Sequence, residues 1–357
     1  MIGFLTVFIN FEKKELSTRG KILIWILLSF LLVLLFFIDI LIGSVHIPAS
    51  DILKALFTEE KLPEAWSRII WYFRFPKAIT ALLAGLGLSI SGLQMQTIFR
   101  NPLAGPYVLG ISAGASLGVA IMVMGVTGIF AGAFIAHYSQ WMIAFAAWLG
   151  AGLILLLILA VSMRVKDIMT ILILGIMFGS ATSAIVNILQ YFSDETMLKA
   201  FVVWTMGSLG GVSRSQLMVL APGVVLGSLM AVFSSKMLNA MLVGENYARS
   251  MGMNIKLSRF FVFFSTSLLA GSVTAFCGPI GFVGIAVPHI GRMVFNTAKH
   301  QVLLPGSMLL GGIVLLLSDI VSQLPGSDAT LPINSITALI GIPVIIWIIV
   351  RNRKIMV

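Results

Sequence analysis

The chain has 357 residues, of which 59% are hydrophobic and only 10% are charged, and its net charge is +10. A mean hydropathy of +1.06 excludes an ordinary water-soluble domain, in which about a quarter of the residues are charged. Its apolar runs are continuous rather than alternating, which excludes an outer-membrane β-barrel. The composition therefore predicts an all-α polytopic membrane protein, organised as a single transmembrane domain over residues 1–357.

Continuous apolar runs mark the predicted membrane spans, because a helix needs about 20 apolar residues to cross a bilayer. The sequence predicts about ten of them. The third, eighth and ninth are short or Gly-rich enough to be broken helices. The ten spans are expected at residues 22–42, 77–98, 103–125, 141–163, 168–190, 216–233, 260–276, 282–298, 302–320 and 333–350.

The positions of lysine and arginine predict the orientation, because short cytoplasmic loops carry an excess of both. With a cytoplasmic N-terminal tail, residues 1–21, most of the 23 Lys and Arg residues fall on the inner side. Both termini and the segment 235–259 are then cytoplasmic. The positive net charge reflects this bias of the inner face and predicts no nucleic-acid partner. The first eleven residues lack a basic region and are too short to predict a cleaved signal peptide.

Residues 99–118, FRNPLAGPYVLGISAGASLG, end one helix and begin another with almost no loop. Pro102 and Pro106 prevent a continuous helix there. Gly110, Gly114 and Gly118 then recur every four residues and leave one helix face nearly bare. Such a face predicts that another helix backbone packs very close to it.

Small and polar residues follow one face of the fifth predicted span: Gly175, Gly179, Ser183, Asn187 and Gln190. This stripe is not expected to face lipid. It has two interpretations, which the sequence leaves open. It either packs against another helix, as small residues often do in membranes, or lines a translocation pathway. Gln94 and Gln96 on the second span are lesser candidates for the pathway.

Residues 235–259, SKMLNAMLVGENYARSMGMNIKLSR, insert a charged stretch between two apolar runs. Its core, residues 244–252, predicts two short helices around a turn, with Gly244 and Gly252 at the breaks. Two short polar helices suit the docking of a partner better than catalysis. An ordinary amphipathic surface loop is the alternative.

The chain lacks the motifs of a protein that powers its own transport. No GxxxxGK[ST] loop is present to bind a nucleotide. Asp39 and Asp319 are the only acidic residues within predicted spans, and both lie near outer ends, which argues against a proton- or sodium-driven carrier. Cys277 is the only cysteine, which excludes an intrachain disulfide and a Cys-cluster metal site. His289 has no second ligand at metal spacing, so no metal site is predicted.

Several motifs resemble the FecCD-type family, the permease subunits of ABC importers for iron chelates and cobalamin. The string NPLAGPYVLGISAGA within residues 99–118 resembles the family signature, with Gly105 where relatives usually have an acidic residue. The resemblance covers about residues 68–350, and Gln323 replaces an Arg that relatives often carry after the ninth-span Asp. The other matching stretches are Arg74-Phe75-Pro76-Lys77, WTMGSLGG at 204–211, GPIGFVGIAVPHIGR at 278–292 and Leu331-Pro332-Ile333-Asn334.

The resemblance implies a type II ABC importer permease that works as a homodimer. Its implied partners are two cytoplasmic ATPase subunits and an extracytoplasmic binding protein, in a bacterial cytoplasmic membrane. ATP hydrolysis would take place on the separate ATPase chain, so this subunit is expected to be no enzyme and to need no cofactor. The implied cargo is a ferric siderophore, with heme and cobalamin as alternatives. A stand-alone secondary carrier is the alternative from another class.

The resemblance also implies roles for residues that match the family motifs. ATPase coupling is expected at Gly244, Glu245, Ala248, Arg249 and Gly252. Docking of the binding protein is expected at Arg74 and Lys77. The fifth-span stripe of Gly175, Gly179, Ser183, Asn187 and Gln190 is expected to line the pathway at the centre of the homodimer.

Overall fold

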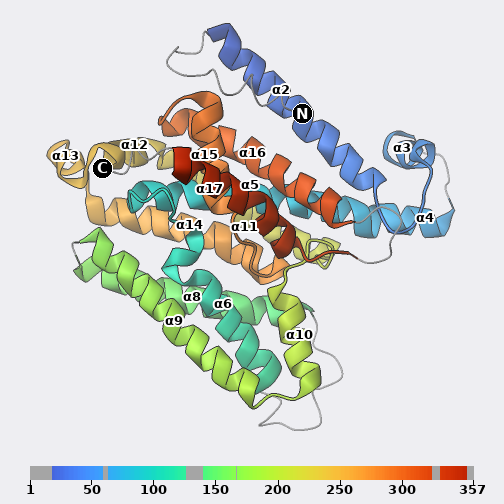
Figure 1. Cartoon of the computed structure of the whole chain (residues 1–357), viewed down its shortest axis with the longest axis horizontal. Helices are drawn as coiled ribbons and strands as arrows, with labels where there is room; N and C mark the ends of the chain where they lie inside the picture. Colours follow the sequence, from blue (N-terminus) through green and yellow to red (C-terminus); the bar gives the residue numbers. More distant parts are fainter. Residues whose placement is uncertain (1–17, 59–62, 126–139, 166, 324–329, 352–357) are drawn as a thin grey trace.

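The structure is a computed structural model that describes residues 18–58, 63–125, 140–165, 167–323 and 330–351, and these residues are nearly all helical. Figure 1 shows a bundle with α5, α14 and α16 near its centre, flanked by α2 on one side and by α8 and α9 on the other. The longest elements are α2 (Thr18–Leu41), α5 (Phe75–Ile98), α8 (Gln140–Arg164), α9 (Ile168–Tyr191), α11 (Arg214–Phe233), α14 (Ile255–Cys277), α16 (His300–Ser322) and α17 (Ile333–Arg351).

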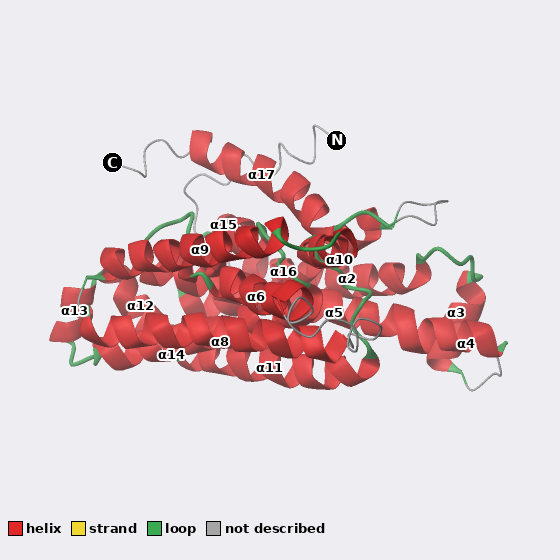
Figure 2. Cartoon of the chain, turned by 90° about the horizontal axis from the view of Figure 1, so that it is seen from below, coloured by secondary structure: helices red, strands yellow, loops and turns green. Residues whose placement is uncertain are grey.

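Shorter elements connect these helices or lie at the two ends of the bundle. Helices α12 and α13 lie at one end, and α3 and α4 at the opposite end (Figures 1 and 2). The shorter elements are α3 (Ala49–Phe57), α4 (Glu64–Ile69), the π-helical turn η1 (Ile70–Arg74), the 3₁₀ turn η2 (Pro106–Leu109), α6 (Ile111–Ala120), the π-helical turn η3 (Ile121–Gly125), α10 (Glu195–Thr205), α12 (Ser235–Val243), α13 (Glu245–Ser250) and α15 (Val283–Phe295).

The predicted all-α membrane fold is confirmed. Seven helices of the described chain are long and apolar enough to cross a bilayer, and three shorter apolar helices begin at Ile111, Val283 and Ile333. Each of the ten corresponds to one predicted span. The predicted second span is too short, because α4, η1 and α5 form one continuous helical segment from Glu64 to Ile98.

Two of the three helices predicted to be broken are interrupted or short. The third span begins with η2, and Gly110 then adopts φ +73° before α6 begins. The eighth span is the 13-residue α15, which follows Phe282 at φ +66°. The prediction for the ninth span is wrong: α16 is continuous over 23 residues, and its Gly311 lies against the Gly85 backbone of α5, so this glycine serves helix packing rather than a break.

Glycines let the central helices approach to backbone contact. A Cβ added to Gly114 would lie 2.5 Å from the Gly150 carbonyl oxygen, and one added to Gly118 would lie 2.0 Å from that of Ala146. Helices α6 and α8 therefore touch along the bare face predicted for residues 110–118, which confirms that prediction. Glycines also allow α5 to pack closely against α15, where Gly92 faces Gly284.

Candidate functional sites

The segment 235–259 forms a compact cap at one end of the bundle (Figure 1). Helix α12 ends at Gly244, which has φ +146°, and α13 is followed by Gly252 at φ +82°. Both glycines therefore occupy backbone conformations that other residues rarely adopt. Two short helices are present, as predicted, but they do not both lie within residues 244–252. Only α13 lies there, whereas α12 ends before Gly244.

An ion pair fastens α13 to α14. The buried Arg259 guanidinium donates to Glu245 from Nη2 at 2.6 and 2.7 Å and from Nε at 3.0 Å. Such a two-pronged pair fixes orientation as well as distance. Glu245 therefore positions α13 on the bundle. Of the other residues predicted here, Ala248 is fully buried, whereas Arg249 and Gly252 are exposed.

The outward surface of α13 and the turn after it carries Tyr247, Arg249 and Met251. Tyr247 is 52% exposed and Met251 is 65% exposed. This surface combines large apolar side chains with a cation, and the ion pair between Glu245 and Arg259 fixes the helix that carries it. Such a surface is suited to a protein partner. The sequence motif pointed to this segment, but it did not separate the residues that face outward from those that hold the helix in place.

A buried hydrogen-bond network joins α12 to the centre of the bundle. The Oδ1 of Asn239 accepts from the His300 backbone N–H at 2.9 Å and lies 2.9 Å from its ring Nδ1. The other ring nitrogen, Nε2, lies 2.8 Å from the Thr97 hydroxyl on α5. Asn239 also donates to Gln301 at 2.7 Å. Movement of α12 is thereby linked to α5 and α16 through polar contacts whose loss would leave buried groups unpaired.

The predicted stripe on α9 divides into two parts. A Cβ on Gly175 would lie 2.6 Å from the Val108 carbonyl oxygen, so this residue packs against η2 inside the chain. Gly179 also faces inward, toward Gly110 at 3.7 Å. Ser183 and Asn187 are exposed, and Gln190 is half-buried. The glycines thus fit the packing interpretation, while the polar residues lie on a face that nothing in the described chain covers.

Gln94 and Gln96 are buried inside the bundle rather than lining an open path. The Gln94 side-chain oxygen accepts from Thr266 at 2.9 Å, and its nitrogen donates to Ser265 at 3.1 Å. Gln96 accepts from Arg292 at 2.6 Å. Their side chains join α5 to α14 and α15, so the expectation that they contribute to a pathway is not met in this structure.

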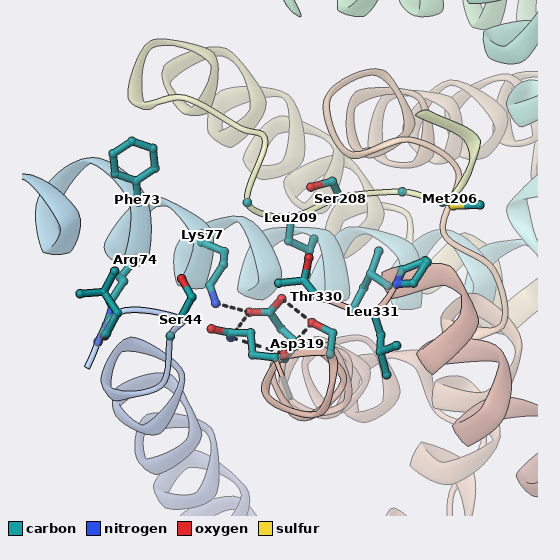
Figure 3. A pocket seen from close by; sticks show the side chains of 18 of the residues that line it. Ser44, Phe73, Arg74, Lys77, Met206, Ser208, Leu209, Asp319, Thr330 and Leu331 are labelled. Carbon is teal, nitrogen blue, oxygen red and sulfur yellow. Dashed lines mark hydrogen bonds and ion pairs between the residues drawn. The ribbon is translucent and has the colours of Figure 1, made fainter. Parts of the chain in front are cut away.

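At the opposite end of the bundle, two carboxylates share one lysine. The Lys77 ammonium on α5 lies 2.8 Å from Asp319 Oδ2 on α16 (Figure 3). It also lies 3.7 Å from Asp39 Oδ1 on α2. Gln323 donates to both carboxylates, at 3.1 and 3.3 Å. The cluster ties three helices together beside a cavity of about 620 Å³, which Arg74 also lines.

Arg74 is 4% exposed and is hydrogen-bonded to the backbone where α2 ends. Its guanidinium donates to the carbonyl oxygens of Ile40 at 3.1 Å and Leu41 at 3.0 Å, and also to that of Val45. Arg74 thus satisfies carbonyl groups that a helix end leaves unpaired. Docking of a binding protein at Arg74 and Lys77 stays a prediction, and within this chain both residues make internal contacts.

Replacing Lys77 by methionine is expected to lower the free energy of unfolding by about 3 to 5 kcal/mol, the range for breaking a buried ion pair. Asp39 and Asp319 would then face each other without a cation, and Asp39 Oδ2 already has no hydrogen-bond partner in the described chain. Unfolding of the purified chain in detergent measures the change. The matched control is Arg68→Met, which removes a 2.6 Å pair with Glu64 at an exposed site and should cost at most about 1 kcal/mol. Equal losses for both variants would contradict a buried, structural role for Lys77.

Comparison with known proteins decides the family. The sequence profile of the FecCD transport family matches residues 31–351, which is most of the chain. The chain belongs to the FecCD transport family. It is thus an ABC importer permease with several membrane-spanning helices.

Individual relatives of this FecCD permease agree with that assignment. It is 35% identical to the vitamin B12 import system permease protein of Klebsiella pneumoniae over 91% of this chain and 93% of that protein. It is 34% identical to the corresponding protein of Citrobacter koseri over 80% of this chain and 84% of the other. Among solved structures, "An inward-facing conformation of a putative metal-chelate type ABC transporter" matches with a TM-score of 0.78 and 30% identity, over 91% of this chain and 97% of that chain.

Two residues of the FecCD permease that the sequence singled out have structural contacts. His289 Nε2 lies 2.8 Å from the Pro102 carbonyl oxygen, which ties α15 to the loop before η2. Asn334, found where the family motif has Gly, accepts from the Gly281 backbone N–H at 3.0 Å. Within the described ranges, no three His, Cys, Asp or Glu side chains gather in an arrangement that could hold a metal ion.

Proposed function

We propose that this permease is one of two identical membrane subunits of a binding-protein-dependent ABC importer, and that two separate ATPase subunits dock on α12 and α13. The supporting observation is the exposed surface formed by Tyr247, Arg249 and Met251. The ion pair between Glu245 and Arg259 attaches the helix that carries this surface to α14. A docking surface must be rigid to transmit motion, and this one has a buried ion pair beneath it. ATP hydrolysis is assigned to the docked subunits and not to this chain.

The end that carries α12 and α13 is proposed to face the cytoplasm of a bacterial cell. The first residues of α2 and the last of α17 lie toward the same end (Figure 1). A ring contact supports this placement of α2: Trp25 lies 4.7 Å from Phe295, the last residue of α15. We therefore propose that the start of α2 and the end of α17 lie on the cytoplasmic side, in agreement with the distribution of Lys and Arg.

The exposed face of α9 is proposed to line the translocation pathway between two copies of the chain. Ser183 and Asn187 are exposed polar side chains on a long apolar helix, and such groups are costly against lipid. A second copy, or water between the two copies, would remove that cost. A surface of small residues and hydroxyl groups holds a bulky cargo only weakly, which allows the cargo to leave.

Ser183→Phe is expected to reduce transport at least about tenfold while the chain still folds and dimerises, because Phe would project from an exposed position into the proposed gap. Gly175→Leu is the contrasting variant. It should destabilise the chain itself by about 1 to 3 kcal/mol or more, because Val108 backbone fills the space. Uptake and size-exclusion chromatography separate the two effects. If Ser183→Phe instead yields monomers with normal subunit stability, this face serves packing and not passage.

Docking of the binding protein is proposed at the end that carries α3 and α4, over the rim of the 620 Å³ cavity. Arg74 and Lys77 would contribute indirectly, by holding the ends of α2, α5 and α16 in position beneath the docking surface. The charge of the outer surface would then affect mainly the rate of association.

The cargo is proposed to be a bulky metal chelate, with a ferric siderophore as the first candidate. Cobalamin is the second candidate, favoured by the two relatives that are named as vitamin B12 permeases. Heme is a further possibility within the same chemical class. All three cargoes are large, and all carry a metal that the transporter need not ligate.

Reconstitution tests the cargo. Vesicles that contain the permease, its ATPase and its binding protein are loaded with ATP on the ATPase side and offered labelled ferric siderophore, cobalamin or heme. Accumulation of one of these above an ATP-free control would support the proposal and identify the cargo. Accumulation of none, by an assembly whose ATPase is stimulated by the binding protein, would contradict a metal-chelate cargo.

A further inference from the structure

A second cavity, of about 320 Å³, lies beside α13 at the end of the bundle that carries the docking surface. Three cationic side chains line it: Arg249 of α13, and Lys256 and Arg259 of α14. The rest of its wall consists of Val165, Met253, Asn254 and Ile255, so the cavity lies where the end of α8 meets the start of α14. The first backbone N–H groups of a long helix add positive potential there.

Two of the three cations are not engaged by the protein. In the part of the chain that the structure describes, the side chains of Arg249 and Lys256 form no ion pair or hydrogen bond, and both residues are exposed. Arg259 is committed to Glu245. The nearby Asp167 accepts hydrogen bonds from the Thr170 hydroxyl and backbone N–H, which lower the pKa of its carboxyl group and keep it ionised, but it is not among the residues that line the cavity. Among the lining side chains, Arg249 and Lys256 therefore carry positive charge without a paired carboxylate.

An aromatic stripe on α14 follows Lys256, which lines the cavity. Lys256, Phe260 and Phe264 follow one another at intervals of four residues, so they share the outer face of α14. Phe260 and Phe264 are 41% and 38% exposed, and their rings stack at 6.1 Å with an interplanar angle of 13°. Figure 2 shows α14 running alongside α8 and α11. The predicted span starts at Phe260, so Lys256 lies about one turn outside the hydrocarbon region.

We propose that this cavity binds the phosphate head group of an anionic phospholipid, whose acyl chains lie along Phe260 and Phe264. Cations beside the end of a membrane helix attract anionic lipid, and a neighbouring apolar stripe adds the burial of the chains. An acidic side chain of a docked subunit would satisfy the same charges, but it would leave the adjacent aromatic stripe unused. The lipid is therefore the better match to the whole surface.

The bound lipid would join α13 to α14 through a second set of contacts. Its phosphate would lie between Arg249 on α13 and Lys256 on α14, parallel to the ion pair between Glu245 and Arg259. Anionic lipid would thereby help to hold the docking surface in place. This inference requires a membrane-spanning chain, but it depends neither on the identity of the cargo nor on docking of an ATPase.

Lipid binding to the full-length chain tests the proposal. The chain is purified in a neutral detergent, and the retention of phosphatidylglycerol and of phosphatidylcholine with the same acyl chains is compared by native mass spectrometry. Arg249→Gln with Lys256→Gln is expected to lower the preference for phosphatidylglycerol at least about tenfold. The matched control, Lys236→Gln with Lys299→Gln, removes two exposed cations from the same end of the bundle and should leave the preference unchanged.

Two further arms distinguish the possible occupants. Free glycerol phosphate in excess should not displace the lipid, whereas Phe260→Ala with Phe264→Ala should weaken the retention of both lipids. An unchanged preference in the Arg249 and Lys256 variant would overturn the proposal. Displacement of the lipid by glycerol phosphate would also overturn the proposal, because the site would then bind a soluble anion. If that variant lost only its ATPase partner and kept its lipid preference, the cavity would belong to a protein interface.

Discussion

Replacing Gly92 by alanine is expected to destabilise the folded chain by more than about 3 kcal/mol, the upper end of the usual cost of overpacking. The added Cβ would lie 1.7 Å from the Gly284 carbonyl oxygen and 2.4 Å from its carbonyl carbon. Both are backbone atoms, so no side chain can rotate away, and α5 and α15 must separate. Lost packing between α5 and α15 is costly in a membrane, because close packing is the interaction that holds helices together there.

Gly152→Ala is the matched control, since it makes the same change in α8. No atom lies within 4 Å of the Cβ that it adds, so it should gain about 0.5 to 1 kcal/mol from the better helix propensity of alanine. Unfolding of both purified variants in detergent measures the difference. Similar stability for the two variants would show that α5 and α15 are not in backbone contact.

Gly252→Pro is expected to uncouple transport while the membrane part of the chain remains folded. Gly252 has φ +82°, whereas proline requires about −65°. Proline would also remove the N–H that donates to the Arg249 carbonyl oxygen at 2.9 Å. Forcing such a backbone costs about 1 to 3 kcal/mol, which corresponds to about a tenfold or greater loss of the docked arrangement.

The control at this position is Gly252→Asn, because asparagine tolerates positive φ and a Cβ here meets no atom within 4 Å. Uptake in the reconstituted importer and the unfolding midpoint of the chain are measured for both variants. Reduced uptake with an unchanged midpoint is expected for proline alone. Wild-type uptake by Gly252→Pro would remove α13 and its turn from the coupling mechanism.

The membrane spans could be predicted from sequence because lipid imposes a simple rule on length and polarity. The rule does not specify where a helix continues beyond the hydrocarbon region. Nothing in it shows that residues 64–74 extend the second span, or that the small amphipathic helices α3 and α10 exist. A glycine is also ambiguous in sequence, because it can break a helix or let another helix approach. The glycines of the ninth span were expected to break the helix, but Gly311 instead packs against the Gly85 backbone.

The candidate sites were predicted less completely, because the roles of their residues depend on contacts between distant parts of the chain. Glu245 positions α13 only because the chain brings Arg259, 14 residues later, into hydrogen-bonding distance of its carboxylate. Arg74 is buried because the chain around residues 40–45 returns to its guanidinium. His300 gave no signal in sequence. Its role is visible only when Asn239 and Thr97 are placed on either side of its ring.

The central claim is that this permease moves its cargo only when a separate ATPase acts on α12 and α13. Uptake into vesicles is therefore measured with the permease alone and with the permease, ATPase and binding protein together, each with and without ATP and with and without proton and sodium gradients. The account predicts uptake only by the complete assembly with ATP, at a rate that ionophores leave unchanged. Gradient-driven uptake by the permease alone would contradict it and would make the chain a secondary carrier.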